Sequence, residues 1–106
     1  MANVKTFNEI KDTVIRYKSL LESDNFPVEK MIIFGSSAKG TAKEYSDIDV
    51  CVVSDKFARN KDKHETYLWK KAMEVDARIE PVAYAPKDFI NADPLAYEIK
   101  KLGVVV

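Results

Sequence analysis

The stretch that decides the fold is MIIFGSSAKGTAKEYSDIDVCVV, residues 31–53. It opens with a short apolar run, Met31–Phe34, which is rich in strand-forming residues and stops at Gly35. A polar link follows and holds two of the three glycines of the chain. Ile48–Val53 then alternates Asp with apolar residues before it becomes fully apolar. These patterns predict two strands joined by a polar connection.

A helix is predicted before the first of these strands. Thr6 is followed three residues later by Glu9, which is the pattern of a capping box. Asp24, Asn25 and Pro27 are residues that end helices. Between these signals, apolar residues recur at steps of three and four, which places them on one helical face: Phe7, Ile10, Val14, Tyr17 and Leu21.

Two more helices and a third strand are predicted after residue 53. Asp62 with Glu65 starts a helix, and Arg78–Tyr84 is a strand in which Pro81 removes a ladder donor, so this strand should lie at a sheet edge or be bulged. Asp93 and Pro94 are typical of the first positions of a last helix that ends at Gly103. The helix that starts near residue 62 has its predicted core stripe at Leu68, Ala72 and Val75, widened by Trp69 and Met73.

The predicted order is helix, strand, strand, helix, strand, helix, which indicates an α/β or α+β protein with a small sheet. The 106 residues, of 12.1 kDa, are enough for one small domain, so we expect a single domain over residues 1–106.

Composition and charge exclude several classes of protein. Seventeen Lys and Arg balance seventeen Asp and Glu, and this neutrality argues against a protein that binds nucleic acid through a basic surface. No apolar run approaches the roughly 20 residues of a membrane span, and the first residues lack the apolar core of a secretion signal. The one cysteine, Cys51, cannot form an internal disulfide. We therefore expect a protein of the reducing cytoplasm.

Paired carboxylates at the start of the second strand indicate a metal site. Strand geometry directs the side chains of Asp47 and Asp49 to the same face and leaves Ile48 on the other. Two adjacent carboxylates repel each other unless something neutralises them. Mg²⁺ is suited to this because it takes oxygen ligands and keeps positions open for phosphate oxygens. Glu80, on the third predicted strand, could complete the site as a third ligand.

The turn after the first strand has the features of a phosphate site. Gly35 allows close approach of a ligand or a positive φ, and Ser36 adds a hydroxyl donor. A turn that leads into a helix presents free N–H groups to an anion, and Lys39 and Lys43 are near enough to add positive charge. A phosphate site next to a carboxylate metal site predicts phosphoryl or nucleotidyl transfer.

These residues together resemble a known signature. Gly35-Ser36, ten intervening residues and Asp47-Ile48-Asp49 are similar to the G-S-x10-D-x-D motif of the DNA polymerase beta-like nucleotidyltransferase superfamily. The segment Gly35–Gly40 followed by Ser46–Asp49 most resembles the minimal nucleotidyltransferases (MNT), which are single small domains. The resemblance extends over roughly residues 30–100, because the segment Arg78–Tyr84 is similar to the strand that supplies the third carboxylate of the family.

The resemblance implies the nucleotidyltransferase fold, a short mixed sheet with helices packed on one side. It implies a transfer of a nucleoside monophosphate, AMP from ATP, to a hydroxyl acceptor. Asp47 and Asp49 would bind Mg²⁺, Gly35, Ser36 and Lys39 would bind the nucleotide, and Glu80 would bind metal or act as general base. Catalytic and metal-binding roles thus fall on Asp47, Asp49 and Glu80.

The chain departs from the family pattern at two positions. Ser37 stands where many relatives have Arg, which weakens the expected phosphate clamp. The third carboxylate would be Glu80 where many members of the superfamily have Asp, and Asp76 competes with Glu80 for this role.

The resemblance also implies a partner. Minimal members of the family are often paired with a helical HEPN protein and act as antitoxins by adenylylating it, so the expected acceptor is a tyrosine of such a partner, with a homodimer as the simpler arrangement. The apolar tail at residues 103–106 would leave surface for another chain unless it pairs within its own sheet.

The alternative is a non-catalytic subunit of a two-protein complex that binds nucleotide or partner. A template-directed polymerase is disfavoured because there is no basic channel.

Overall fold

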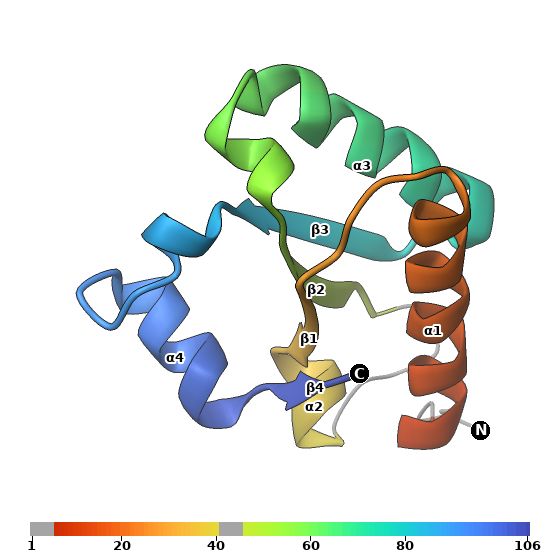
Figure 1. Ribbon diagram of the computed structural model, residues 1–106. Coiled ribbons are helices and arrows are strands. Elements are labelled where there is room, and N and C mark those ends of the chain that lie inside the picture. Colours follow the sequence, from red (N-terminus) through yellow and green to blue (C-terminus); the bar gives the residue numbers. More distant parts are fainter. Residues whose placement is uncertain (1–5, 41–45) are drawn as a thin grey trace.

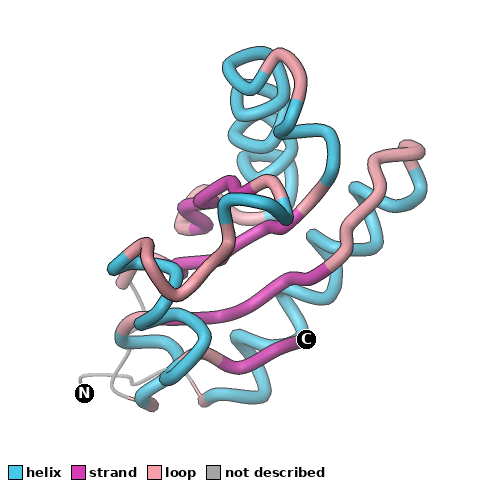
Figure 2. The backbone as a smooth tube through the Cα atoms, turned by 60° about the vertical axis from the view of Figure 1, so that its left-hand side comes forward, coloured by secondary structure: helices cyan, strands magenta, loops and turns pink. Residues whose placement is uncertain are grey.

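A mixed four-stranded sheet with strand order β3-β2-β1-β4 forms the centre of the computed structural model, which describes residues 6–40 and 46–106 (Figures 1 and 2). Two short 3-10 turns, η1 (Asp55–Ala58) and η2 (Pro86–Asp88), follow β2 and β3. The helices and strands in chain order are α1 (Phe7–Ser23), β1 (Lys30–Phe34), α2 (Ser36–Lys39), β2 (Ile48–Val53), α3 (Lys61–Val75), β3 (Ile79–Tyr84), α4 (Pro94–Leu102) and β4 (Val104–Val105).

The pairing of the strands fixes which residues lie side by side. β1 and β2 are antiparallel, with Phe34 opposite Asp49, and β2 and β3 are parallel, with Asp49 opposite Glu80. Parallel neighbours need a long crossover, which α3 supplies. β3 lies at the edge of the sheet, which confirms the expectation drawn from Pro81, because only an edge strand tolerates the missing N–H donor.

The two faces of the sheet are covered by different helices. Alternate residues of β1 and β2, such as Ile33 and Val50, are buried against α1 and α3. The other face, which includes Cys51 and Tyr84, is covered by α4 and by Phe89 after η2. Figure 1 shows α4 across the sheet from α1 and α3. The small α/β sheet of the nucleotidyltransferase fold is thus confirmed, and packing on one side describes α1 and α3 but not α4.

The predicted capping residues form the ends of two helices. Thr6 Oγ1 accepts a hydrogen bond from the backbone N–H of Glu9 at 3.2 Å and donates to the Glu9 carboxylate at 2.9 Å, as in a capping box. The Asp93 side chain accepts from the Ala96 N–H at 3.0 Å, and Pro94 occupies the first turn of α4. Buried Tyr17 Oη donates to the Leu68 carbonyl at 2.9 Å, which ties α1 to α3.

The structure corrects one expectation about α3 and decides the alternative that was open for the apolar tail. Trp69 and Met73 are 44% and 65% exposed, so only Leu68, Ala72 and the partly buried Val75 form the core stripe of α3. The apolar tail pairs within its own sheet, because Val104 lies opposite Ile33 as part of β4.

Candidate active site

Three carboxylates lie together where β2 begins. Asp47 directly precedes β2 and is exposed, whereas Asp49 and Glu80 are half-buried. Asp49 and Glu80 are register partners on adjacent strands, so their side chains emerge on the same face of the sheet. Cys51 and Tyr84 lie on this same face. Further along the strands, α4 covers the face at these two residues. The structure therefore brings together the three residues that the sequence singled out.

The surroundings of Asp49 and Glu80 raise the pKa of both carboxyl groups. Burial raises the pKa of Asp49, and the nearby charge of Asp47 raises it further. The pKa of Glu80 is raised first by a side-chain hydrogen bond with Asp47, then by burial and by the charges of Asp47 and Asp49. In the described part of the chain, none of the three forms an ion pair with Lys or Arg. Among the described residues, no cation is paired with this concentration of negative charge.

Gly35 is held directly against this cluster. Its φ of 72° and ψ of −150° are open to glycine but disfavoured for residues with a side chain. A Cβ at position 35 would also collide with Asp49 Oδ2. The backbone of the turn can therefore approach Asp49 only because residue 35 is glycine, which explains the Gly-Ser at this point of the sequence.

The turn continues into the short helix α2, which begins at Ser36 and has Lys39 in its last turn. Ser37, where the resemblance led us to expect Arg, is fully buried, and its hydroxyl has no hydrogen-bond partner among the residues that the structure describes. Gly40 ends α2 in the left-handed conformation, with a φ of 74°. Lys43 falls outside the described residues.

A small pocket of about 140 Å³ adjoins the turn and extends the site toward α4. It is lined by Phe34, Gly35, Lys39, Glu98 and Leu102. Glu98 and Leu102 were not predicted from the sequence. Both are exposed residues of α4, and no local sequence pattern indicates where this helix lies relative to the turn. Any ligand held by Gly35 and Lys39 has these two side chains as neighbours.

Of the two candidates for the third carboxylate, Glu80 lies beside Asp49 in the sheet, whereas Asp76 lies outside the strands. Asp76 follows α3, and its side chain accepts from the backbone N–H of Arg78 at 2.9 Å and from the Arg78 guanidinium at 2.5 Å. This structural ion pair occupies the Asp76 carboxylate. Glu80 instead lies opposite Asp49 and interacts with both other carboxylates.

The residues present fit a hard divalent cation in their chemistry. Over residues 6–40 and 46–106, no group of three His, Cys, Asp or Glu side chains is arranged to hold a metal ion. The side chains of Asp47, Asp49 and Glu80 offer only carboxylate oxygens, the type of ligand that Mg²⁺ prefers, and a bound cation would relieve the repulsion between them.

A mixed sheet with paired carboxylates at the start of one strand, and a glycine turn against them, defines the class of nucleotidyltransferases. The family model described as "Nucleotidyltransferase domain" matches residues 14–106. The chain belongs to this nucleotidyltransferase family, and within it resembles the minimal, MNT-type members.

Individual relatives agree with this assignment. A "putative protein adenylyltransferase" of Methanocaldococcus jannaschii is 32% identical over 92 residues, which cover 87% of this chain and 95% of the relative. A second protein of that organism with the same description is 40% identical over 52 residues, about half of each chain. A crystal structure of a "putative nucleotidyltransferase" from Sulfolobus solfataricus aligns with a TM-score of 0.65 over 99% of this chain and 89% of that one. At 18% identity, that structure supports the fold alone.

Proposed function

We propose that the protein is a Mg²⁺-dependent adenylyltransferase that moves AMP from ATP to a hydroxyl group of a protein. The observation that carries the proposal is the meeting of Gly35, Asp49 and Glu80 at one point of the sheet. A phosphate-binding turn in contact with one carboxylate of an acidic cluster is what nucleotidyl transfer requires. The relatives described as protein adenylyltransferases support the donor and the class of acceptor.

Asp47, Asp49 and Glu80 would hold the metal, which supplies charge neutralisation and polarises the phosphate oxygens when bound. Gly35 and Ser36 would bind the β- and γ-phosphates through the N–H groups of the turn and the Ser36 hydroxyl, and Lys39 would add a positive charge. These contacts orient the α-phosphorus toward the acceptor.

In the alternative role, Glu80 would leave the metal to Asp47 and Asp49 and take the proton of the acceptor. Its raised pKa brings it nearer to the working pH than an ordinary glutamate, which suits a general base. The acceptor oxygen then forms a bond to the α-phosphorus, the bond from that phosphorus to the bridging oxygen breaks, and pyrophosphate leaves. The hydroxyl proton ends on the Glu80 carboxylate.

The acceptor that we propose is a tyrosine of a helical HEPN-type partner, which would give the protein an antitoxin role in the cytoplasm. A neutral chain suits a protein acceptor better than a polyanionic one. Leu102 and Val105 are 52% and 62% exposed beside the outer edge of β4, which would offer a strand edge and apolar surface to a partner or to a second copy of the chain. Across the described residues, no helix is long and apolar enough to cross a membrane.

Co-expression with the adjacent reading frame tests the acceptor. The chain is purified with Mg²⁺ and ATP, and the co-purified protein is measured by mass spectrometry. We expect one added adenylate on a tyrosine of the partner, absent when Asp49→Asn replaces the wild type. A stable complex that binds ATP without adenylate transfer would support the non-catalytic alternative. A monomer that modifies a small hydroxylated metabolite equally well without a partner would contradict the proposed acceptor.

A further inference from the structure

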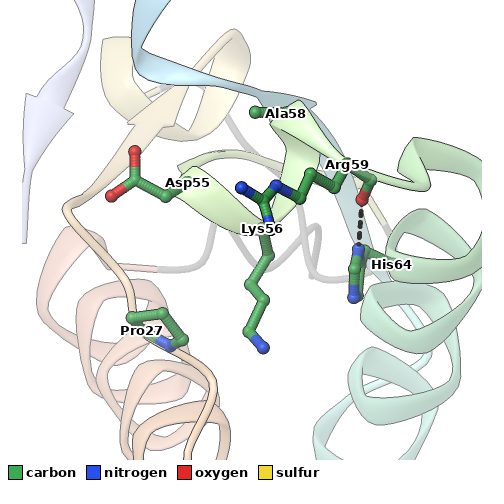
Figure 3. A pocket seen from close by; sticks show the side chains of 6 residues that line it. All are labelled: Pro27, Asp55, Lys56, Ala58, Arg59 and His64. Carbon is green, nitrogen blue, oxygen red and sulfur yellow. Dashed lines mark hydrogen bonds between the residues drawn. The ribbon is translucent and has the colours of Figure 1, made fainter.

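A second pocket lies at the end of the sheet opposite the carboxylate cluster. Its volume is about 490 Å³, within the range of small-molecule sites. Asp55 and Lys56 in its wall follow the last residue of β2, whereas Asp47 precedes the first. At about 3.3 Å per residue, the pocket is on the order of 20 Å from the carboxylates, so it is not part of that site. The pocket is lined by Pro27, Asp55, Lys56, Ala58, Arg59 and His64 (Figure 3).

The charges of this pocket are available to a ligand. Lys56 and Arg59 are exposed, and neither forms an ion pair with another described residue, whereas Lys61 pairs with Glu65 nearby at 3.6 Å. Figure 3 shows both side chains between Asp55 and Pro27 on one side and His64 on the other. Because two cations face one carboxylate, the charged side chains of the lining are positive on balance, which favours an anion.

His64 is fixed in position by its neighbours. Its Nδ1 lies 2.9 Å from the Arg59 carbonyl oxygen, which can only accept, so Nδ1 donates and Nε2 remains for a ligand. The imidazole also lies edge-on to the ring of Phe26, with centroids 6.1 Å apart. These two contacts hold the imidazole where α3 begins, beside the two cations.

We propose that this pocket binds a nucleoside monophosphate, separately from the transferase site. Arg59 and Lys56 match a phosphate group, for which Arg offers a planar fork of donors and Lys a compact charge. The apolar walls at Pro27 and Ala58 suit a base, and the Asp55 carboxylate on the Pro27 side can accept hydrogen bonds from ribose hydroxyls. An inorganic anion would leave the apolar walls and Asp55 without partners. The proposal rests on these residues alone and does not depend on the proposed function.

Titration of AMP into the ¹⁵N-labelled protein tests the proposal. EDTA is present throughout, so that no divalent cation is available to the carboxylate cluster. We expect saturable shifts of the backbone amides of residues 55–59 and 64, and about tenfold weaker binding of inorganic phosphate and of adenosine than of AMP. Arg59→Ala and Lys56→Ala should each weaken AMP binding about tenfold, because each removes a charge-assisted contact. Lys63→Ala is the matched control, an exposed lysine that does not line the pocket, and should leave binding unchanged.

Circular dichroism establishes that each variant is folded. Equal affinity for phosphate and AMP would overturn the nucleoside part of the proposal. Shifts centred on Gly35–Lys39 would assign AMP to the transferase site, and shifts scattered over surface lysines and insensitive to Arg59→Ala would show non-specific attraction. Either of these results would overturn the second site.

Discussion

The α-carbon of Gly35 lies so close to the carboxylate of Asp49 that a Cβ at position 35 would collide with Asp49 Oδ2. The two residues come from different elements, the end of β1 and the start of β2, and antiparallel pairing brings them together with Phe34 opposite Asp49. This contact joins the turn that would hold phosphate to the carboxylate that would hold metal.

Gly35→Ala should therefore impair both stability and transfer. Alanine at this φ costs about 1–3 kcal/mol of unfolding free energy, and the collision displaces Asp49 as well. Urea denaturation and adenylate transfer are the measurements. Gly40→Ala is the matched control, because Gly40 also has a positive φ but an added Cβ meets no atom of the described residues within 4 Å.

A double-mutant cycle separates the collision from the backbone strain. With Asp49→Ala in the background, Gly35→Ala should cost less, since the carboxylate is gone. An equal cost in both backgrounds would show that the contact with Asp49 carries no energy.

Acid should stabilise the fold through Glu80. Its folded pKa is raised above the unfolded value, so the folded state binds more protons between the two values. The contribution of Glu80 to stability therefore falls as the pH rises through that window. We expect Glu80→Gln to be more stable than wild type near pH 7, with the advantage shrinking as the pH falls through the raised pKa of Glu80 and lost below its ordinary value of 4.5. Thermal unfolding across this range measures the difference, and an advantage that grows toward acid would refute the assignment.

Substitutions at Glu80 and at Asp76 should have different effects on adenylate transfer and on stability. Glu80→Gln should lower adenylate transfer by at least about 100-fold, because it removes a metal ligand or the general base. Asp76→Asn weakens the ion pair with Arg78 and should lower stability by about 1–3 kcal/mol with little change in transfer. Rates and melting temperatures of both variants are compared side by side. The reverse pattern would make Asp76 the third carboxylate.

ATP should stabilise the protein much more with Mg²⁺ than with a chelator. The carboxylates repel one another and the triphosphate, so binding without a cation adds negative charge to negative charge. Differential scanning fluorimetry with ATP and Mg²⁺, with ATP and EDTA, and with Mg²⁺ alone gives the comparison. Equal shifts of the melting temperature by ATP with Mg²⁺ and by ATP with EDTA would show that ATP binding does not depend on the metal.

Local patterns were sufficient to predict most elements of this fold. Thr6 and Asp93 mark helix starts through their own side chains, and the alternation at Asp47 and Asp49 is a property of one strand. The Gly-Ser turn and the Asp pair could thus be identified as site residues. Their meeting with Glu80 follows from the parallel register of β2 and β3, which depends on how α3 crosses over.

The predictions that the structure corrects concern features that depend on tertiary packing. Trp69 and Met73 extend the apolar stripe of α3, yet the helix turns Leu68 and Ala72 to the sheet and leaves the other two in solvent. The position of α4 depends on the whole topology, because this helix joins β3 at one edge to β4 at the other and must cross the sheet. The face covered by α1 and α3 is already filled, so α4 takes the opposite one.

The central claim is that Asp49 acts in transfer and not in folding, and Asp49→Asn tests it most directly. The protein, co-expressed and co-purified with the product of the adjacent reading frame, is incubated with Mg²⁺ and ATP labelled at the α-phosphorus. The label on protein is counted, and the same sample is melted thermally. Because the substitution relieves carboxylate repulsion, we predict an unchanged or slightly higher melting temperature and a loss of transfer of several orders of magnitude. A variant that unfolds, or one that stays folded and transfers label at the wild-type rate, would contradict the account.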